Sequence, residues 1–274
     1  MRELGWVYGR DFVTERRAYG DQLERIPDLA VELSRKGVDV FLVQGAPQAA
    51  RVQQVTQTIP IVATSADLVA AGRATGLARP GANVTGVQTL GQLAGKHLSL
   101  LREVIVGFSR AGVLETPDGD QGIFAAYIQE AEASAKALNV LLQVPTVHGA
   151  GDFATAFAAF RHDRAQAILV HWTPVLVSHF KTVAALALKH RLPTISDLPD
   201  FASAGGLMTY GVNGSEVSRL VADIIDKIFR GAKASEVPIR QATTFWLAIN
   251  LKTAKALGLT IPPSLLLRAD QVIE

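Results

Sequence analysis

Short apolar runs alternate with amphipathic stretches along most of the chain. The runs typical of β-strands cover residues 39–43, 59–63, 84–87, 111–114, 140–144, 167–170 and 194–195. The stretches typical of helices lie between them, at 21–35, 47–57, 91–104, 122–138, 152–164 and 174–190. Strands separated by helices of this length form βαβ units and a mostly parallel sheet. The pattern therefore predicts an α/β, doubly wound fold.

The alternation runs twice. One series ends near Val104, and a new strand begins at Arg110. Two α/β lobes of about a hundred residues each fit this better than one sheet of ten or more strands. We expect an N-terminal lobe of residues 1–107 and 211–241, and a C-terminal lobe of residues 108–210 and 242–274.

Composition narrows the class of protein. Of the 274 residues, 49% are hydrophobic and 19% are charged, a balance that excludes intrinsic disorder. The net charge of only +2 gives no indication of nucleic-acid binding. The chain has no cysteine, which excludes disulfides, thiolate metal sites and cysteine nucleophiles. The opening MRELGW lacks the apolar region of a secretory signal, so none is expected in the chain as given.

The sequence patterns of common enzymes are missing. No nucleophile elbow, phosphate-binding loop, zinc-protease helix or dinucleotide fingerprint occurs. His171 and His179 are eight residues apart, too far for a compact helical metal pair. Acids such as Glu132, Asp152 and Asp163 fit solvated helix faces. We therefore expect no catalytic residues, no metal, no cofactor and no enzyme activity.

Many predicted strands end in turn residues that lead into a helix. In open α/β sheets, ligands bind outside the carboxyl ends of the strands. The candidate ligand-binding residues are therefore those of these loops. In the first lobe they are Gln44, Gly45, Ala46, Ser65 and Asp67, and in the second lobe Glu115, Thr116, His171, Trp172, Thr173, Asp197 and Tyr210.

Several of these residues also have a purely structural interpretation. Trp172 fits a core tryptophan at a strand end as well as the aromatic wall of a ligand cleft. His171 fits a packed loop histidine. Asp67 fits a helix N-cap or a partner for a ligand ammonium group. Gln44 fits a capping or hydrated side chain as well as a ligand contact, and Tyr210 is expected to face the cleft.

Motifs along the whole chain resemble one protein family. They are RELGW at 2–6, LAVEL at 29–33, IPIV at 59–62, LARPGANVTG at 77–86, LLRE at 100–103, AGGLMTYG at 204–211 and INLKTAKALGLTIPPSLL at 249–266. The chain in these stretches resembles the ABC-transporter substrate-binding proteins that include tryptophan- and tyrosine-type uptake receptors. The resemblance implies a type I periplasmic-binding-protein fold, in which two Rossmann-like lobes joined by three crossovers close on a small molecule.

The chain departs from the family pattern in two places. Family members normally have a signal peptide and a first strand before the RELGW motif, with which this chain opens. The N-terminal lobe is then expected to lack that strand and to expose an edge for pairing. We expect the chain either to form a homodimer through this lobe or to be less stable there than in the C-terminal lobe. In addition, the Ser-Asp-Pro type of loop in the family reads Ser65-Ala66-Asp67-Leu68 here.

The resemblance implies the substrate-binding component of an ABC importer, which captures an amino acid or aromatic metabolite by hinge closure. Its partners would be the small-molecule ligand and an ABC permease in the membrane, with no nucleic acid. The location implied is the periplasm or cell envelope. The alternative is the ligand-sensing domain of a transcription regulator with the same bilobal fold.

Overall fold

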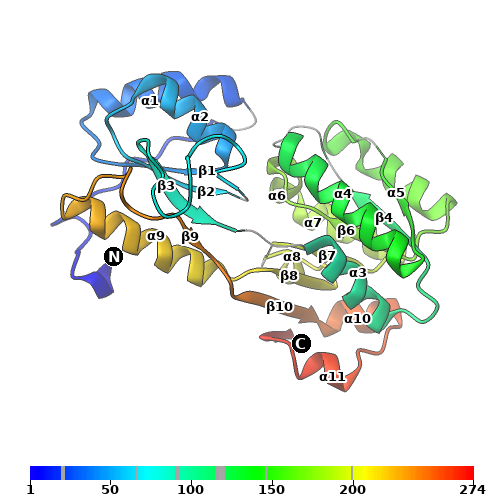
Figure 1. Cartoon of the computed structure of the whole chain (residues 1–274). Coiled ribbons are helices and arrows are strands. Elements are labelled where there is room, and N and C mark those ends of the chain that lie inside the picture. The colour runs from blue at the N-terminus through cyan, green and yellow to red at the C-terminus, as the bar shows by residue number, and fades with distance from the viewer. Residues whose placement is uncertain are drawn as a thin grey trace. The chain divides into compact units, whose positions relative to one another are not determined.

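The fold is that of a computed structural model, which describes residues 1–19, 22–65, 67–89, 93–114, 116, 121–145, 147–198 and 200–274. The chain divides into two compact units (Figure 1). Unit 1 consists of Met1–Gly91 and Gly214–Thr244, and unit 2 consists of Gln92–Asn213 and Phe245–Glu274. The chain therefore passes from one unit to the other three times.

Unit 1 is built on a parallel sheet with the strand order β1-β2-β3-β9 in its described part. The strands are β1 Phe41–Gln44, β2 Ile61–Ser65, β3 Val84–Gln88 and β9 Arg240–Gln241. Helices α1 Ile26–Arg35 and α2 Ala46–Val55 lie on one face, and α9 Gly214–Phe229 lies on the other (Figure 1). Short 3-10 turns cover Arg2–Leu4 and Leu23–Arg25. In this order β1 lies at one edge of the sheet. Apolar side chains of α1 and α2 share a buried cluster with those of β1 and β2.

Unit 2 has a larger sheet, with the strand order β11-β10-β8-β7-β6-β4-β5. Neighbouring strands are parallel except for β8 and β10, which are antiparallel. The strands are β4 Arg110–Leu114, β5 Leu141–Gln143, β6 Ala167–Val170, β7 Thr194–Ser196, β8 Met208–Val212, β10 Phe245–Asn250 and β11 Gln271–Ile273. The inner strand β6 is fully buried, as expected for a strand covered on both faces.

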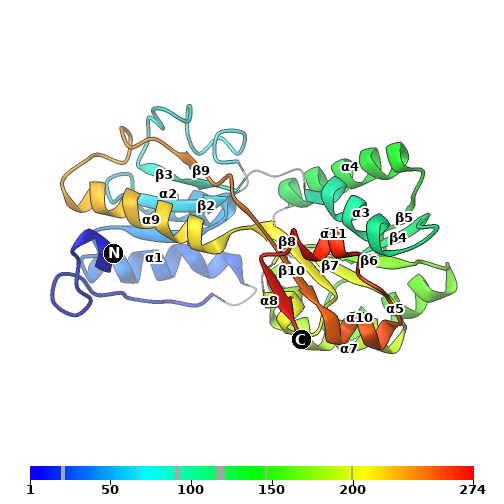
Figure 2. The ribbon, with the colours of Figure 1, turned by 90° about the horizontal axis from the view of Figure 1, so that it is seen from below.

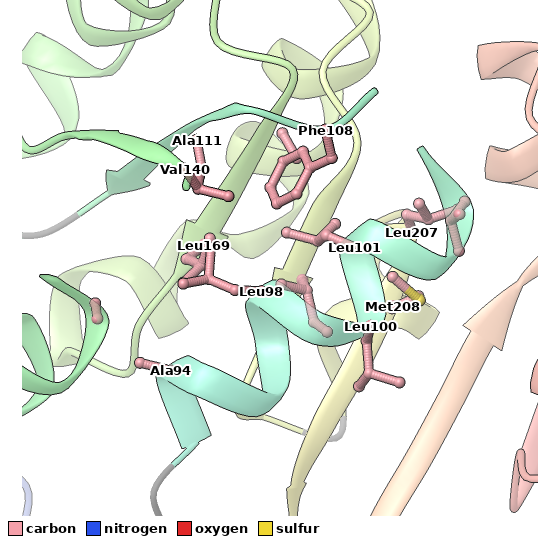
Figure 3. Packing of buried hydrophobic residues seen from close by; sticks show 14 of the residues in the cluster. Ala94, Leu98, Leu100, Leu101, Phe108, Ala111, Val140, Leu169, Leu207 and Met208 are labelled. Carbon is pink, nitrogen blue, oxygen red and sulfur yellow. The ribbon is translucent and has the colours of Figure 1, made fainter. Parts of the chain in front are cut away.

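Helices cover both faces of the unit 2 sheet (Figure 2). On one face, α3 Leu93–Val104 and α4 Gln121–Leu138 enclose a core in which Leu98 and Leu101 meet Leu169 (Figure 3). On the other face, α5 Phe153–His162, α6 Pro174–Ser178, α7 Phe180–Lys189 and α8 Asp200–Ser203 surround a second core. A 3-10 turn at Ala150–Asp152 precedes α5, and α10 Leu251–Leu257 and α11 Pro263–Leu266 follow β10.

The predicted fold class is confirmed, because each predicted strand run overlaps one of the strands β1 to β7. The single helix predicted over 174–190 is wrong. The chain turns at His179, whose φ of −121° separates α6 from α7.

The boundary between the two halves also differs from the division expected from the sequence. The sequence pattern assigns residues 93–107 to the first lobe, whereas α3 packs on the sheet of unit 2 and belongs to that unit. The reason is the apolar face of α3: Ala94, Leu98 and Leu101 are fully buried against unit 2.

Candidate functional site

In unit 1, candidate residues lie at the carboxyl ends of β1 and β2. Gln44 is the exposed last residue of β1, and Ala46 is the buried first residue of α2. Gly45 between them has a φ of 103°, and a Cβ there would overlap the Gln48 side chain. The positive φ and the crowded Cβ position both require glycine at this turn.

Asp67 is used inside its own loop. Its Oδ1 accepts hydrogen bonds from the backbone N–H groups of Val69 and Ala70, both at 2.9 Å. The same oxygen accepts a third hydrogen bond from Gln88 Nε2, at 2.6 Å. Asp67 thus accepts from the backbone as a capping carboxylate does, but the residues that follow it form a turn and not the helix that the sequence suggested.

The end of β3 adds Gln88, a residue that the sequence analysis missed. Ser65 pairs with Gln88 in the parallel register of β2 and β3. Both side chains are buried, and Ser65 Oγ and Gln88 Oε1 have no hydrogen-bond partner among the described residues. Buried polar atoms are normally paired. We call Gln44, Ser65, Asp67 and Gln88 the unit-1 cluster.

In unit 2, two threonines join the ends of β4 and β6. Thr116 Oγ1 and Thr173 Oγ1 are 2.6 Å apart, and both residues are 1% exposed. Thr173 is also the N-cap of α6, where its Oγ1 accepts a hydrogen bond from Leu176 N at 3.2 Å. Glu115, another candidate, lies outside the described residues. The threonine contact fixes the two strand ends relative to each other.

His171 and Asp197 connect the ends of β6 and β7. His171 Nδ1 lies 3.1 Å from Asp197 Oδ2, and the two side chains are 9% and 11% exposed. Burial alone would raise the pKa of Asp197, but the charge and hydrogen bond of His171 outweigh it and lower that pKa. Asp197 is therefore a buried carboxylate that keeps its negative charge. We call Thr116, His171, Thr173 and Asp197 the unit-2 cluster.

Two residues that the sequence analysis missed support this cluster. The ring of Tyr127, on α4, stacks on His171. The Tyr127 hydroxyl lies 3.1 Å from Nδ1 of His97, on α3, and Nε2 of His97 lies 2.7 Å from the Tyr210 carbonyl oxygen. Because a carbonyl oxygen only accepts, Nε2 carries the proton and Nδ1 accepts from Tyr127. Burial lowers the pKa of His97, which favours this neutral form.

The two aromatic candidates are only half-buried. Tyr210 lies on β8, where its ring stacks on Phe245 with 5.5 Å between centroids. Lys96 Nζ lies 5.8 Å from the same ring. Trp172 lies in the turn between β6 and α6, next to His171 and Thr173. Half-burial at a strand end leaves part of each ring available for contact with another molecule.

Two further features concern possible metal ligands and membrane-spanning helices in the described part of the chain. No group of three His, Asp or Glu side chains able to hold a metal ion gathers there. None of the helices described is both long enough and apolar enough to cross a bilayer.

One family model matches nearly the whole chain. The family model "ABC transporter substrate binding protein" matches residues 13–273. No curated protein matches the sequence. A conserved domain protein from Vibrio cholerae has the same fold, with a TM-score of 0.89, 22% identity, and coverage of 99% of this chain and 90% of its own.

Two further solved structures have similar folds. An ABC domain from Streptococcus pneumoniae in complex with L-Trp has a TM-score of 0.82 and 23% identity over 92% of this chain and 84% of its own. A LacI family transcriptional regulator from Bifidobacterium animalis has a TM-score of 0.58 and 15% identity over 86% of this chain and 84% of its own. The likeness to these structures shows the fold, and the match of the family model over nearly the whole length shows that the chain belongs to the family of ABC transporter substrate-binding proteins.

Proposed function

We propose that this chain captures a small molecule and presents it to an ABC permease. The observation that carries the proposal is the pair of clusters at the carboxyl ends of strands, one in each unit of a substrate-binding family member. In a hinged two-unit protein, a ligand that contacts both units stabilises the closed form. The permease would then distinguish the closed, ligand-bound form from the open form.

The proposed ligand is an amino acid or a related aromatic metabolite. Asp197 is buried and charged, so it suits the ammonium group of an amino acid. Asp67 suits it less, since its Oδ1 already accepts three hydrogen bonds. The half-buried rings of Trp172 and Tyr210 offer flat apolar surfaces for an aromatic side chain. The L-Trp complex of the streptococcal relative supports the same class of ligand.

The remaining candidates complete the proposed contact surface. In unit 1 we propose contacts from the turn of Gln44, Gly45 and Ala46 and from Ser65, with Gln88 as an addition. In unit 2 we propose contacts from Thr116, His171 and Thr173, and from Glu115. We propose binding without catalysis, in the periplasm or cell envelope, where members of this family typically work.

A thermal-shift screen tests the proposal. The probes are the standard amino acids and small aromatic acids, and binding to the folded state alone raises the melting temperature. We expect L-tryptophan or another amino acid to stabilise the chain in a saturable way. A matched control is the N-acetylated amino acid, which keeps the side chain but removes the ammonium charge. No stabilisation by any compound would contradict the proposal.

A ligand-sensing domain of a transcription regulator is the second candidate. The LacI family neighbour supports it, although with a lower TM-score than the Vibrio and streptococcal neighbours. The gene neighbourhood separates the two functions. Adjacent permease and ATPase genes would support transport, whereas a fused or adjacent DNA-binding helix-turn-helix segment would support regulation.

A further inference from the structure

A cavity of about 630 Å³ lies in unit 2, at the end of the sheet opposite the unit-2 cluster. Its wall includes the residues just before β6 and β7, whereas His171 and Asp197 of the cluster follow the last residues of these strands. The four residues of β6, at roughly 3.3 Å each, separate the two places by about 13 Å. The cavity is therefore distinct from the cluster, and its volume lies in the range of small-molecule sites, about 300–1,000 Å³.

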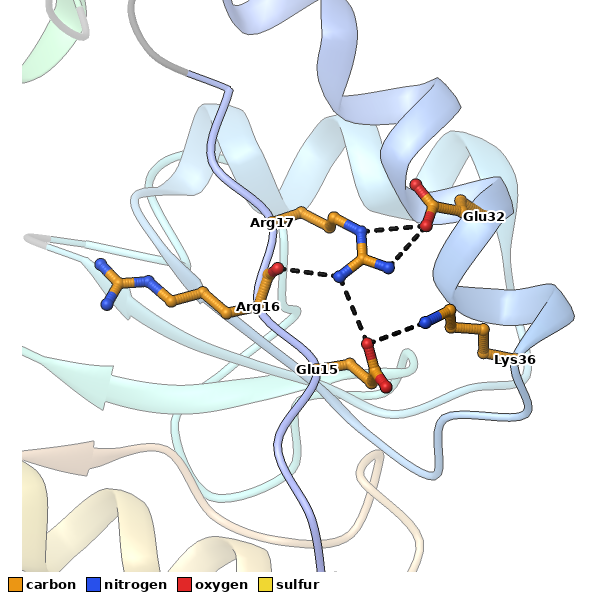
Figure 4. Close-up of polar contacts among 5 residues, drawn as sticks. All are labelled: Glu15, Arg16, Arg17, Glu32 and Lys36. Atoms are coloured by element: carbon orange, nitrogen blue, oxygen red, sulfur yellow. Dashed lines mark hydrogen bonds and ion pairs between the residues drawn. The ribbon is translucent and has the colours of Figure 1, made fainter.

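Three arginine side chains line this cavity: Arg161, Arg164 and Arg191. Within the described structure, none of these guanidinium groups forms an ion pair or a hydrogen bond. Arg17 of unit 1 is a contrast, since its Nε donates to Glu32 Oε1 at 3.0 Å and its Nη1 lies 3.2 Å from Glu15 Oε2 (Figure 4). The described wall contains no Asp or Glu. The cavity thus has positive charge that its own wall does not neutralise.

The backbone conformation of two of these arginines is unfavourable. Arg164 follows α5 with a φ of 61°, and Arg191 follows α7 with a φ of 56°. At the same position after α1 and α9 the chain has Gly37 and Gly231, with φ of 75° and 94°. Glycine is the residue that this left-handed conformation favours after a helix. Residues held in such conformations gather at functional sites, where the side chain has a use.

Neutralising the helix ends does not require the two left-handed arginines. The carboxyl end of a helix carries a partial negative charge, which cations in the last turn stabilise. Arg161 and His162 have this place in α5, and Lys189 has it in α7. Arg110 Nη1 also donates to the Asp163 carbonyl oxygen at 3.2 Å, and the Asp163 carboxylate lies 2.8 Å from His162 Nδ1. The left-handed arginines are additional to this arrangement.

Apolar and fixed elements complete the wall. Leu257, the last residue of α10, and Leu259 are both half-buried. Gln166 holds the loop before β4, because its Oε1 accepts from the N–H of Arg110 at 3.0 Å and its Nε2 donates to the Gly107 carbonyl oxygen at 3.2 Å. The cavity therefore places guanidinium groups beside apolar side chains, a combination that suits an anion with an apolar part.

We propose that this cavity is a second ligand site, which binds the phosphate group of an organic phosphate and packs its apolar part against Leu257 and Leu259. Guanidinium groups donate paired hydrogen bonds to phosphate oxygens. A phosphate monoester has three acceptor oxygens and a charge of about −2 at neutral pH, which three arginines can share. Two sources supply such a group: a soluble phosphate ester and the headgroup of an anionic phospholipid.

Calorimetric titration of the full chain with phenyl phosphate tests the proposal. The controls are phenol, which keeps the ring without the charge, and inorganic phosphate, which keeps the charge without the ring. We expect saturable one-to-one binding of phenyl phosphate. Inorganic phosphate should bind at least about tenfold more weakly, because it lacks the apolar contact. Phenol should not bind at the same concentration.

A double variant, Arg164→Gly with Arg191→Gly, separates a ligand role from a structural one. Glycine suits both left-handed positions, so the variant should unfold at an equal or higher temperature. It should bind phenyl phosphate at least about tenfold more weakly, because two charged donors are lost. Asn139→Gly is the matched control, since Asn139 has a φ of 55° after α4 and does not line the cavity. Lys136→Gln removes a positive charge from α4, and both controls should bind as the unmodified chain does.

Vesicles distinguish the two sources of the phosphate group. Sedimentation with phosphatidylglycerol vesicles that is lost in the double variant would identify a phospholipid headgroup. Binding of phenyl phosphate without such sedimentation would identify a soluble phosphate ester. Phosphatidylcholine vesicles, which have no net charge, are the control and should not sediment the chain.

Four results would overturn the proposal. The first is no saturable binding of phenyl phosphate, and the second is equally tight binding of phenol or of inorganic phosphate. The third is a double variant that binds phenyl phosphate as tightly as the unmodified chain. The fourth is a loss of phenyl phosphate binding in Asp197→Asn, which would place the phosphate at the unit-2 cluster. Because Asp197→Asn should otherwise leave this binding unchanged, the test does not depend on the capture of an amino acid.

Discussion

The ring of Tyr127 lies parallel to the imidazole of His171, with 3.9 Å between their centroids and 9° between their planes. The stack joins α4 to the end of β6, and the hydroxyl of Tyr127 continues the connection to His97 on α3. His171 in turn meets Asp197 at the end of β7. Helices α3 and α4 thus support the unit-2 cluster through His97 and Tyr127. This support favours a fixed shape for this half of the proposed ligand site.

Lowering the pH should destabilise unit 2 through His97. Burial lowers the pKa of His97 in the folded state, so the unfolded state binds the proton more readily. Stability should therefore fall as the pH drops below about 6.5, by at most about 1.4 kcal/mol per pH unit for this one group. Urea denaturation at several pH values, followed by hydrogen exchange in α3, measures the slope.

The control for His97 is an exposed histidine. His97→Asn should lose this part of the pH dependence, and His148→Asn should keep it. An unchanged slope in His97→Asn would mean that other groups cause the acid sensitivity.

Gly211→Ala should destabilise unit 2. Gly211 lies on β8 beside Asp197, and a Cβ there would overlap the Asp197 carbonyl oxygen. Either β8 or the end of β7 must shift, at a cost of about 1–3 kcal/mol. Gly214→Ala is the matched control, because a Cβ at that position would meet nothing within 4 Å. Thermal unfolding of both variants measures the difference, and equal melting temperatures would contradict the crowding at Gly211.

The two aspartates should respond differently to substitution. Asp67→Ala removes the acceptor for Val69 and Ala70 and should cost about 1 kcal/mol of stability with little change in ligand affinity. Asp197→Asn removes the buried charge and should lower the affinity for an amino acid by about tenfold or more. Calorimetric titration with the best ligand of the thermal-shift screen checks both. A larger affinity loss in Asp67→Ala would assign the ligand ammonium to Asp67.

The sequence predicted the strands and their ends well because each strand is a short apolar run bounded by turn residues. The candidates Ser65, Thr173 and Asp197 follow from that pattern, since each lies where a strand stops. Tyr127 and His97 could not be found in this way. They lie inside helices, on faces whose sequence pattern is typical of a buried apolar core. Only the packing of α3 on α4 brings them to His171.

The placement of α3 shows the same limit. Its amphipathic pattern predicts a helix and a buried face, but the pattern does not say which sheet receives that face. Gln88 was missed for a more local reason, because the predicted strand ended one residue before it. Its register with Ser65 becomes visible only when β2 and β3 are paired.

The substitution Trp172→Ala tests whether Trp172 contacts the ligand or packs in the protein core. If the ring stacks on the ligand, the substitution should weaken binding by about 1–3 kcal/mol while the melting temperature of the free chain changes little. Tyr8→Ala removes another aromatic ring that is 66% exposed and should change neither quantity. Loss of stability with unchanged affinity would place Trp172 in the core.

Native mass spectrometry of the chain with its best stabilising ligand tests solute capture most directly. The ligand is added at increasing concentration to the unmodified chain, to Trp172→Ala and to Asp197→Asn. We predict a one-to-one complex with the unmodified chain, with bound fractions that are clearly lower in both variants at the same ligand concentration. No bound mass with any amino acid or aromatic acid, or equal occupancy in all three proteins, would contradict the account.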